Sequence, residues 1–166
     1  REATAAAKTG DLKTISQYID ANPLDLNAYV VSEFLSPNYT FLGYASMKGH
    51  FEIVAFLAEK SDIDLEKGFL SNGGLTPLQI ACREGNIEIA EELLKHPRID
   101  VNSFGIILRE LRYSEESLEE RGMIGALLCK RGNVRPSDYL DKIKDQELIA
   151  KIYTKLDAPK KSARSQ

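Results

Sequence analysis

The chain is poor in the side chains that build reactive centres, since its 166 residues include only two cysteines and two histidines. Cys82 and Cys129 are too few for a disulfide framework, and neither lies in a C-x-x-C pattern. Both lie within apolar helical patterns, which indicates two buried free thiols in a reducing compartment. His50 and His96 stand apart from them without the spacing of metal ligands. We therefore expect no metal, no cofactor and no Cys–His nucleophile.

Long hydrophobic runs are also missing. The longest apolar cluster, at residues 123–129, falls far short of the roughly 18–20 residues that span a bilayer. Residues 3–7 are small and not strongly apolar, so no signal peptide is predicted. The chain starts with Arg1 instead of Met, which favours a processed chain or a fragment of a longer protein. We expect no membrane association.

A surface of one charge sign is not indicated either. The formal net charge is −3, and the 22 basic and 25 acidic residues are interspersed. Nucleic-acid binders usually carry a basic face, whereas here the basic residues cluster only in the tail at 160–164. Carboxylate pairs such as Glu91 and Glu92 indicate a solvated helix face. The Gly-rich segment 72–74 lacks the G-K-[ST] ending of a phosphate-binding loop. The sequence therefore predicts neither a nucleic-acid binder nor an enzyme.

What the chain does contain is an internal repeat. Three segments align without gaps, at residues 3–27, 40–66 and 76–102. Their shared landmarks are Gly10, Gly49 and Gly85, and likewise Ala6, Ala45 and Ala81. Agreement at this many positions is improbable by chance. A repeat of this length is typical of a solenoid.

Each repeat predicts two short helices and an extended loop. In the third segment, Thr76 and Pro77 are an N-cap and a first helical residue. Gly85 ends this helix, as a residue that tolerates the left-handed conformation, and Asn86 begins the next. Such a helix pair buries only one side of each helix, so it needs stacked neighbours to complete its core.

The third segment, TPLQIACREGNIEIAEELLKHPRIDVN, resembles the ankyrin repeat, with its T-P-L-H-x-A opening, a Gly, V-x-x-L-L and a closing V-N. The resemblance is strong over 40–102 and partial over 1–39 and 135–156. In the family, the His after T-P-L helps to link neighbouring repeats by hydrogen bonds. That position holds Gln79 in the third repeat and Gly43 in the second. Because glycine has no side chain to donate or accept, we expect a looser joint at Gly43.

The resemblance implies an all-α ankyrin-repeat solenoid of four to five stacked helix pairs. We expect a repeat domain over 1–156, with repeats at about 1–27, 40–66 and 76–102, an atypical repeat at 105–134, a capping unit at 135–156 and a flexible tail at 157–166.

The resemblance also implies a non-enzymatic scaffold or adaptor that binds another protein or peptide, and no small-molecule substrate, on a concave surface. Loop tips and the last turn of each first helix form this surface. The expected binding residues are Tyr39, Met47, Lys48, Lys67, Phe69, Asn72, Leu75, Arg83, Glu84 and Ser103, with Lys8 and Thr9 in the first repeat. The apolar members are candidate anchors and the charged ones a polar rim. Exposure is favoured for Tyr39 and Met47. The alternative is that the loops fold Tyr29, Phe34, Phe69 and Leu70 back as local cores, and the two interpretations are equally open for Phe34 and Phe69.

Two alternatives stay open at this point. Because the first repeat is already under way at Arg1, the chain is also compatible with the targeting or substrate-recognition module of a larger enzyme. Ankyrin arrays are common in secreted bacterial effectors that act inside a host cell. The expected location is the cytoplasm, or the host cytoplasm for such an effector.

Overall fold

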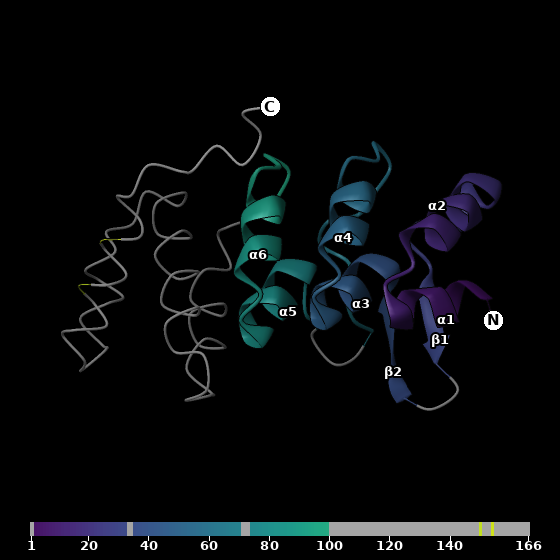
Figure 1. Ribbon diagram of the computed structural model, residues 1–166, viewed down its shortest axis with the longest axis horizontal. Helices are drawn as coiled ribbons and strands as arrows, with labels where there is room; N and C mark the ends of the chain where they lie inside the picture. Colours follow the sequence, from purple (N-terminus) through teal and green to yellow (C-terminus); the bar gives the residue numbers. More distant parts are fainter. Residues whose placement is uncertain (1, 33–34, 71–73, 100–149, 151–153, 155–166) are drawn as a thin grey trace.

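Three helix pairs stand side by side in chain order in the computed structural model, which describes residues 2–32, 35–70, 74–99, 150 and 154 (Figure 1). The pairs are α1 (Glu2–Thr9) with α2 (Leu12–Ala21), α3 (Phe41–Lys48) with α4 (Phe51–Ala58), and α5 (Pro77–Glu84) with α6 (Ile87–Leu94). The first helices pack on one another in the order α1, α3, α5, and the second helices in the order α2, α4, α6. This arrangement confirms a repeat fold built mainly of helices.

The helices begin and end at the residues that the repeat pattern predicts. Gly10, Gly49 and Gly85 end the first helices with positive φ angles of 78°, 77° and 73°. L-residues with a β-carbon rarely adopt this conformation, which explains the repeated glycine. At the other end, Thr40 Oγ1 accepts a hydrogen bond from Gly43 N at 3.0 Å. Thr76 caps α5 in the same way, and Gln79 Oε1 completes a capping box by accepting from Thr76 N at 2.9 Å.

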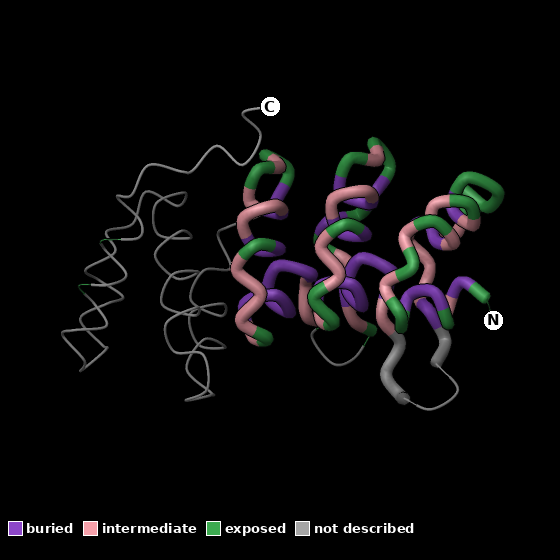
Figure 2. Tube along the Cα trace, in the orientation of Figure 1, coloured by how far each residue is buried: buried purple, intermediate pink, exposed green. Residues whose placement is uncertain are grey.

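The core lies between the helix layers. Ala6, Ala45 and Ala81, the repeated alanines, have exposed fractions of only 5%, 2% and 0%, as predicted. In α3 and α5 six consecutive residues are buried, so these two helices are almost entirely purple in Figure 2. α3 packs against α1, α4 and α5, so it lies at the centre of the described stack. Each fully buried Leu or Ile in this core contributes about 1.5–3 kcal/mol relative to exposure.

The loop between the first two repeats folds as a β-hairpin, which the sequence predicted only as an extended loop. Strand β1 (Tyr29–Ser32) runs antiparallel to β2 (Leu35–Thr40), with Tyr29 opposite Thr40. A one-turn 3-10 helix, η1 (Pro23–Asp25), precedes the hairpin. An isolated bridge joins Tyr39 of β2 to Phe69 of the next loop. The backbone pairing therefore links the loops of two successive repeats.

The joint at Gly43 is tight, and the expectation of a looser joint there is wrong. A β-carbon on Gly43 would lie 2.3 Å from the Gly68 carbonyl oxygen. Thr40 N donates to that same oxygen at 2.9 Å, and Thr40 Oγ1 donates to the Lys67 carbonyl oxygen at 2.7 Å. Because Gly43 lacks a side chain, the following loop reaches the backbone of α3 directly.

Polar side chains also tie successive repeats together at the starts of the second helices. His50 Nε2 donates to the Lys8 carbonyl oxygen at 3.3 Å. Asn86 occupies the equivalent position one repeat later, and its Nδ2 donates to the Ser46 carbonyl oxygen at 2.8 Å. Each contact satisfies a carbonyl near the end of a first helix, where the helix itself offers no partner. His50 therefore has a structural role in the joint between the first two repeats.

Several predictions of domain organisation lie outside the described residues. These are the atypical repeat at 105–134, most of the capping unit at 135–156 and the tail at 157–166. The number of helix pairs beyond three stays a prediction. Among the described helices, none is long and apolar enough to cross a membrane.

Candidate partner-binding surface

The last turns of the first helices align along one edge of the stack. The paired residues are Lys8 and Thr9 in α1, Met47 and Lys48 in α3, and Arg83 and Glu84 in α5. Lys8, Thr9, Lys48 and Glu84 are exposed, whereas Met47 and Arg83 are half-buried. Because α1, α3 and α5 pack in sequence, these equivalent positions follow one another along the stack.

An aromatic cluster lies beside these positions, where β2 and the next loop meet α3. The ring centroids of Tyr39 and Phe69 are 4.7 Å apart, and those of Tyr39 and Tyr44 are 6.1 Å apart. Tyr44 is buried, and burial together with the neighbouring Tyr39 raises its pKa. The structure thus brings together Tyr39 and Phe69, two of the predicted anchors. Tyr44 was not predicted, although its spacing of four residues from Lys48 places both on one helix face.

Tyr39 and Met47 are less exposed than the sequence predicted. Both are half-buried and pack against the hydrophobic core. For Tyr39 the reason is the bridge to Phe69, which holds the ring between α3 and the next loop. Each side chain keeps part of its surface open to solvent, so each can both support the fold and contact a partner.

Lys48 contacts a ring of the aromatic cluster, and Lys67 contacts the ring of Tyr29 in the neighbouring strand β1. Lys48 Nζ lies 5.8 Å from the centroid of the Tyr44 ring, and Lys67 Nζ lies 4.4 Å from the centroid of the Tyr29 ring. Attraction between a cation and a ring face is worth about 0.5–1 kcal/mol at exposed sites. These contacts orient the lysine side chains at the edge of the apolar patch.

Leu70 and Leu75 complete the surface. Leu70 is 53% exposed, although an apolar side chain of this size is usually covered. The alternative of a local core is therefore wrong for Leu70, whereas Phe69 is half-buried. Leu75 is also half-buried. We refer to the described residues Tyr39, Met47, Lys48, Lys67, Phe69, Leu70, Leu75, Arg83 and Glu84 as the loop face. Asn72 and Ser103, the other predicted binding residues, lie outside the described residues.

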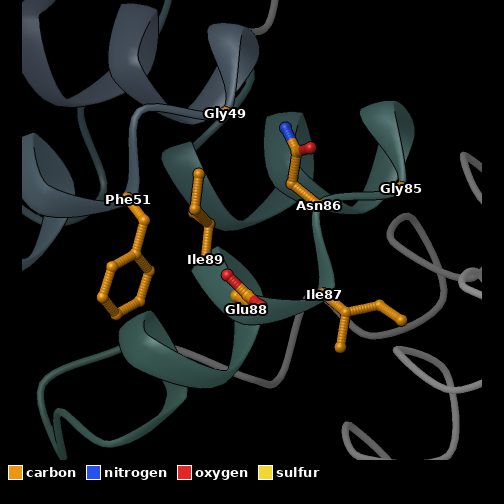
Figure 3. Close-up of a pocket in the computed structure, with 7 residues that line it drawn as sticks. All are labelled: Gly49, Phe51, Gly85, Asn86, Ile87, Glu88 and Ile89. Carbon is orange, nitrogen blue, oxygen red and sulfur yellow. The ribbon is translucent and has the colours of Figure 1, made fainter. Parts of the chain in front are cut away.

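A shallow depression of about 370 Å³ lies elsewhere on the molecule, where the second helices begin (Figure 3). It is lined by Gly49, Phe51, Gly85, Asn86, Ile87, Glu88 and Ile89. The Asn86 amide is already bonded to the Ser46 carbonyl, which leaves Glu88 as the one charged side chain of the lining. The depression is therefore mainly apolar and lacks a pair of groups suited to proton transfer.

The remaining chemistry-bearing groups have structural roles. Cys82 is a fully buried free thiol, as predicted, and burial raises its pKa far above the ordinary value. A thiol in that environment stays protonated and is a poor nucleophile. Cys129 lies outside the described residues. Within the described ranges, no group of three or more His, Cys, Asp or Glu side chains is placed to hold a metal ion.

Comparison with known proteins identifies one family. Residues 4–104 match the family described as Ankyrin repeats (3 copies). No curated protein matches the chain. Ankyrin repeats are generally protein-interaction modules. The match spans more than half of the chain, on the same segments that fold into stacked helix pairs, and shows that the chain belongs to the ankyrin-repeat family.

Proposed function

We propose that the chain is a scaffold or adaptor module that holds a protein or peptide partner on the loop face. One observation carries the proposal: the rings of Tyr39 and Phe69, from two successive loops, lie 4.7 Å apart next to the 53% exposed Leu70 in sequence, and Lys48 and Lys67 contact neighbouring rings. Covering apolar surface stabilises a complex by roughly 25 cal/mol per Å² before the costs of association are subtracted. Half-buried aromatic residues with fixed rotamers lose little further entropy on binding, which suits them as anchors.

The surroundings of the reactive groups support binding over catalysis. A nucleophile needs a general base within hydrogen-bond reach and a path for the substrate. Cys82 is fully buried in α5, and His50 donates to the Lys8 backbone in a joint between repeats. Both side chains therefore have structural roles in the repeat stack that carries the loop face.

Capture of a partner by the full chain and by a loop-face variant tests the proposal. The variant combines Tyr39→Ala, Met47→Ala and Leu75→Ala. The matched control combines Glu52→Gln, Glu59→Gln and Glu88→Gln, all at exposed positions in or directly after the second helices. A partner that is retained by the wild type and the control, and lost by the loop-face variant, supports the proposal. Equal retention by all three proteins refutes it.

Because Tyr39 and Met47 also pack on the core, the loop-face variant risks losing stability. A second variant, Lys48→Glu with Leu70→Ser, changes only exposed side chains of the same surface. Surface changes of this kind usually alter the free energy of unfolding by less than about 0.5 kcal/mol. Loss of the partner by this variant, with an unchanged thermal midpoint by circular dichroism, separates a binding defect from unfolding.

A further inference from the structure

Four cations lie on or beside the loop face, whereas the second helices α4 and α6 are acidic. The net charge of the chain is −3, yet the loop face and the first helices' last turns carry four cations. They are Lys8, Lys48, Lys67 and Arg83. By contrast, α4 and α6 contain no Lys or Arg and carry Glu52, Glu88, Glu91 and Glu92. Lys60 and Lys95, directly after these two helices, pair with Asp20 and Glu92 and offset part of the acidic charge.

The helix dipole accounts for only part of this pattern. Cations are favoured in the last turn of a helix, which covers Lys8, Lys48 and Arg83. Lys67 follows no helix end, and Glu84 already pairs with Arg83 at 3.2 Å. In the part of the chain that the structure describes, no carboxylate lies within ion-pair distance of Lys48 or Lys67. Their contacts are with the rings of Tyr44 and Tyr29, which leave the charge of each ammonium group uncompensated.

We propose that the partner presents an acidic segment, in which an aliphatic or aromatic side chain covers Phe69 and Leu70 while neighbouring Asp or Glu carboxylates bond to Lys48 and Lys67. The inference rests on the proposed function of the loop face. Complementary charge raises the association rate and fixes the orientation of the bound segment. The carboxylates of α4 and α6 disfavour the same segment on these helices, which adds to the preference for the loop face.

A single-stranded nucleic acid is the competing anionic ligand, because aromatic rings between cations also stack on bases. It would require neutralisation of closely spaced phosphates along a continuous basic track. The loop face carries only a few cations, and the chain is negative overall. The observations therefore favour an acidic protein segment.

Selection of short random peptides on the immobilised full chain tests the inference. We expect the recovered peptides to be enriched in Asp and Glu next to an aromatic or aliphatic residue. Their affinity should fall roughly 10-fold between about 50 mM and about 300 mM salt, as screening weakens exposed charge pairs. A recovered peptide, made synthetically, should bind the Lys48→Glu/Lys67→Glu variant at least about 10-fold more weakly.

The matched control is Lys60→Glu with Lys95→Glu, which changes the net charge equally but lies where α4 and α6 end. It should leave the affinity within about 2-fold of the wild type. The two lysines lie at the ends of the second helices, outside the loop face, and salt screens their effect on a segment bound there. The inference is overturned by equal weakening in both variants, by recovery of neutral or basic peptides, by recovery of no peptide, or by tighter binding of a poly-uridine oligonucleotide to the loop face.

The same selection separates the two proposals. Neutral or basic peptides that no longer bind the Tyr39→Ala/Met47→Ala/Leu75→Ala variant would overturn the acidic chemistry and leave the loop face as the binding site. Peptides that bind this variant as tightly as the wild type would overturn the loop face itself, and with it the proposed function.

Discussion

Gly43 lies against Gly68 so closely that a β-carbon on Gly43 would stand 2.3 Å from the Gly68 carbonyl oxygen and 2.7 Å from its α-carbon. Gly43 is in α3, and Gly68 is in the loop that leads to the third repeat. The contact therefore joins two repeats through backbone atoms alone.

We expect Gly43→Ala to destabilise the protein by about 1–3 kcal/mol, because the added methyl group forces the two backbones apart. Helix propensity alone predicts the opposite sign, a gain of about 1 kcal/mol for Ala over Gly. Urea denaturation followed by circular dichroism measures the difference. Ala5→Gly, at an exposed position of α1, measures the propensity effect in the same protein. A Gly43→Ala variant as stable as the wild type, or more stable, would show that the loop containing Gly68 moves aside without loss of stability.

The Thr40 side chain supports the same joint with two hydrogen bonds. Its hydroxyl accepts from Gly43 N at 3.0 Å and donates to the Lys67 carbonyl oxygen at 2.7 Å, and the residue is 3% exposed. Thr40→Val keeps the shape but leaves both partners unsatisfied, so we expect a loss of about 1–3 kcal/mol in thermal or urea denaturation. Thr40→Ser retains the hydroxyl and should lose about 1 kcal/mol or less. Equal stability of the two variants would contradict this role.

A third prediction concerns alkaline pH. The Tyr18 hydroxyl donates to Asp25 Oδ2, and this hydrogen bond raises the pKa of Tyr18 above its ordinary value. A raised pKa in the folded state means that folding favours the protonated phenol. The resulting stability is complete below the unfolded pKa near 10 and is lost as the pH rises through the folded pKa.

Urea midpoints at about pH 8 and about pH 11 measure this effect. The wild type should lose more stability between the two values than Tyr18→Phe, which lacks the titrating group. Tyr44 also has a raised pKa, because of its burial, so a smaller decline should persist in the variant. An identical decline in both proteins would show that the bond between Tyr18 and Asp25 does not contribute.

How far the sequence predicts this molecule depends on how local each feature is. The Thr40 and Thr76 caps and the left-handed Gly49 could be predicted, because each is set by residues within one turn of a helix. The buried alanines followed from the stacking that a one-sided helix pair requires.

The loop geometry could not be predicted in the same way. The hairpin register and the bridge between Tyr39 and Phe69 depend on pairing between residues far apart in the chain. The burial of Tyr39 and the inclusion of Tyr44 in the cluster follow from that pairing. Gly43 shows this limit most clearly. The absence of a side chain predicted a loose joint between repeats, but it allows the Gly68 backbone to approach α3 closely, and the joint is tight.

The last prediction uses Cys82 to report on opening of the stack. Its side chain in α5 is fully buried and burial raises its thiol pKa, so alkylation requires both exposure and ionisation. In a Cys129→Ser background, we expect iodoacetamide to label the native protein at least about 10³-fold more slowly than the urea-unfolded chain, as mass spectrometry can measure. Labelling of the native protein at the unfolded rate would show that α5 is not protected by its neighbours.

The N-terminal cap of α5 should affect the rate at which Cys82 is alkylated. Thr76 Oγ1 accepts from Gln79 N at 3.2 Å, and Gln79 Oε1 accepts from Thr76 N at 2.9 Å. Thr76→Ala removes one side of this box and should cost about 1 kcal/mol, which corresponds to roughly 5-fold faster labelling if opening precedes alkylation. Thr76→Ser keeps the oxygen and should label within about 2-fold of the wild type. If both variants label at the wild-type rate, Cys82 is reached through local motion that leaves the start of α5 intact, and its protection comes from side-chain packing alone.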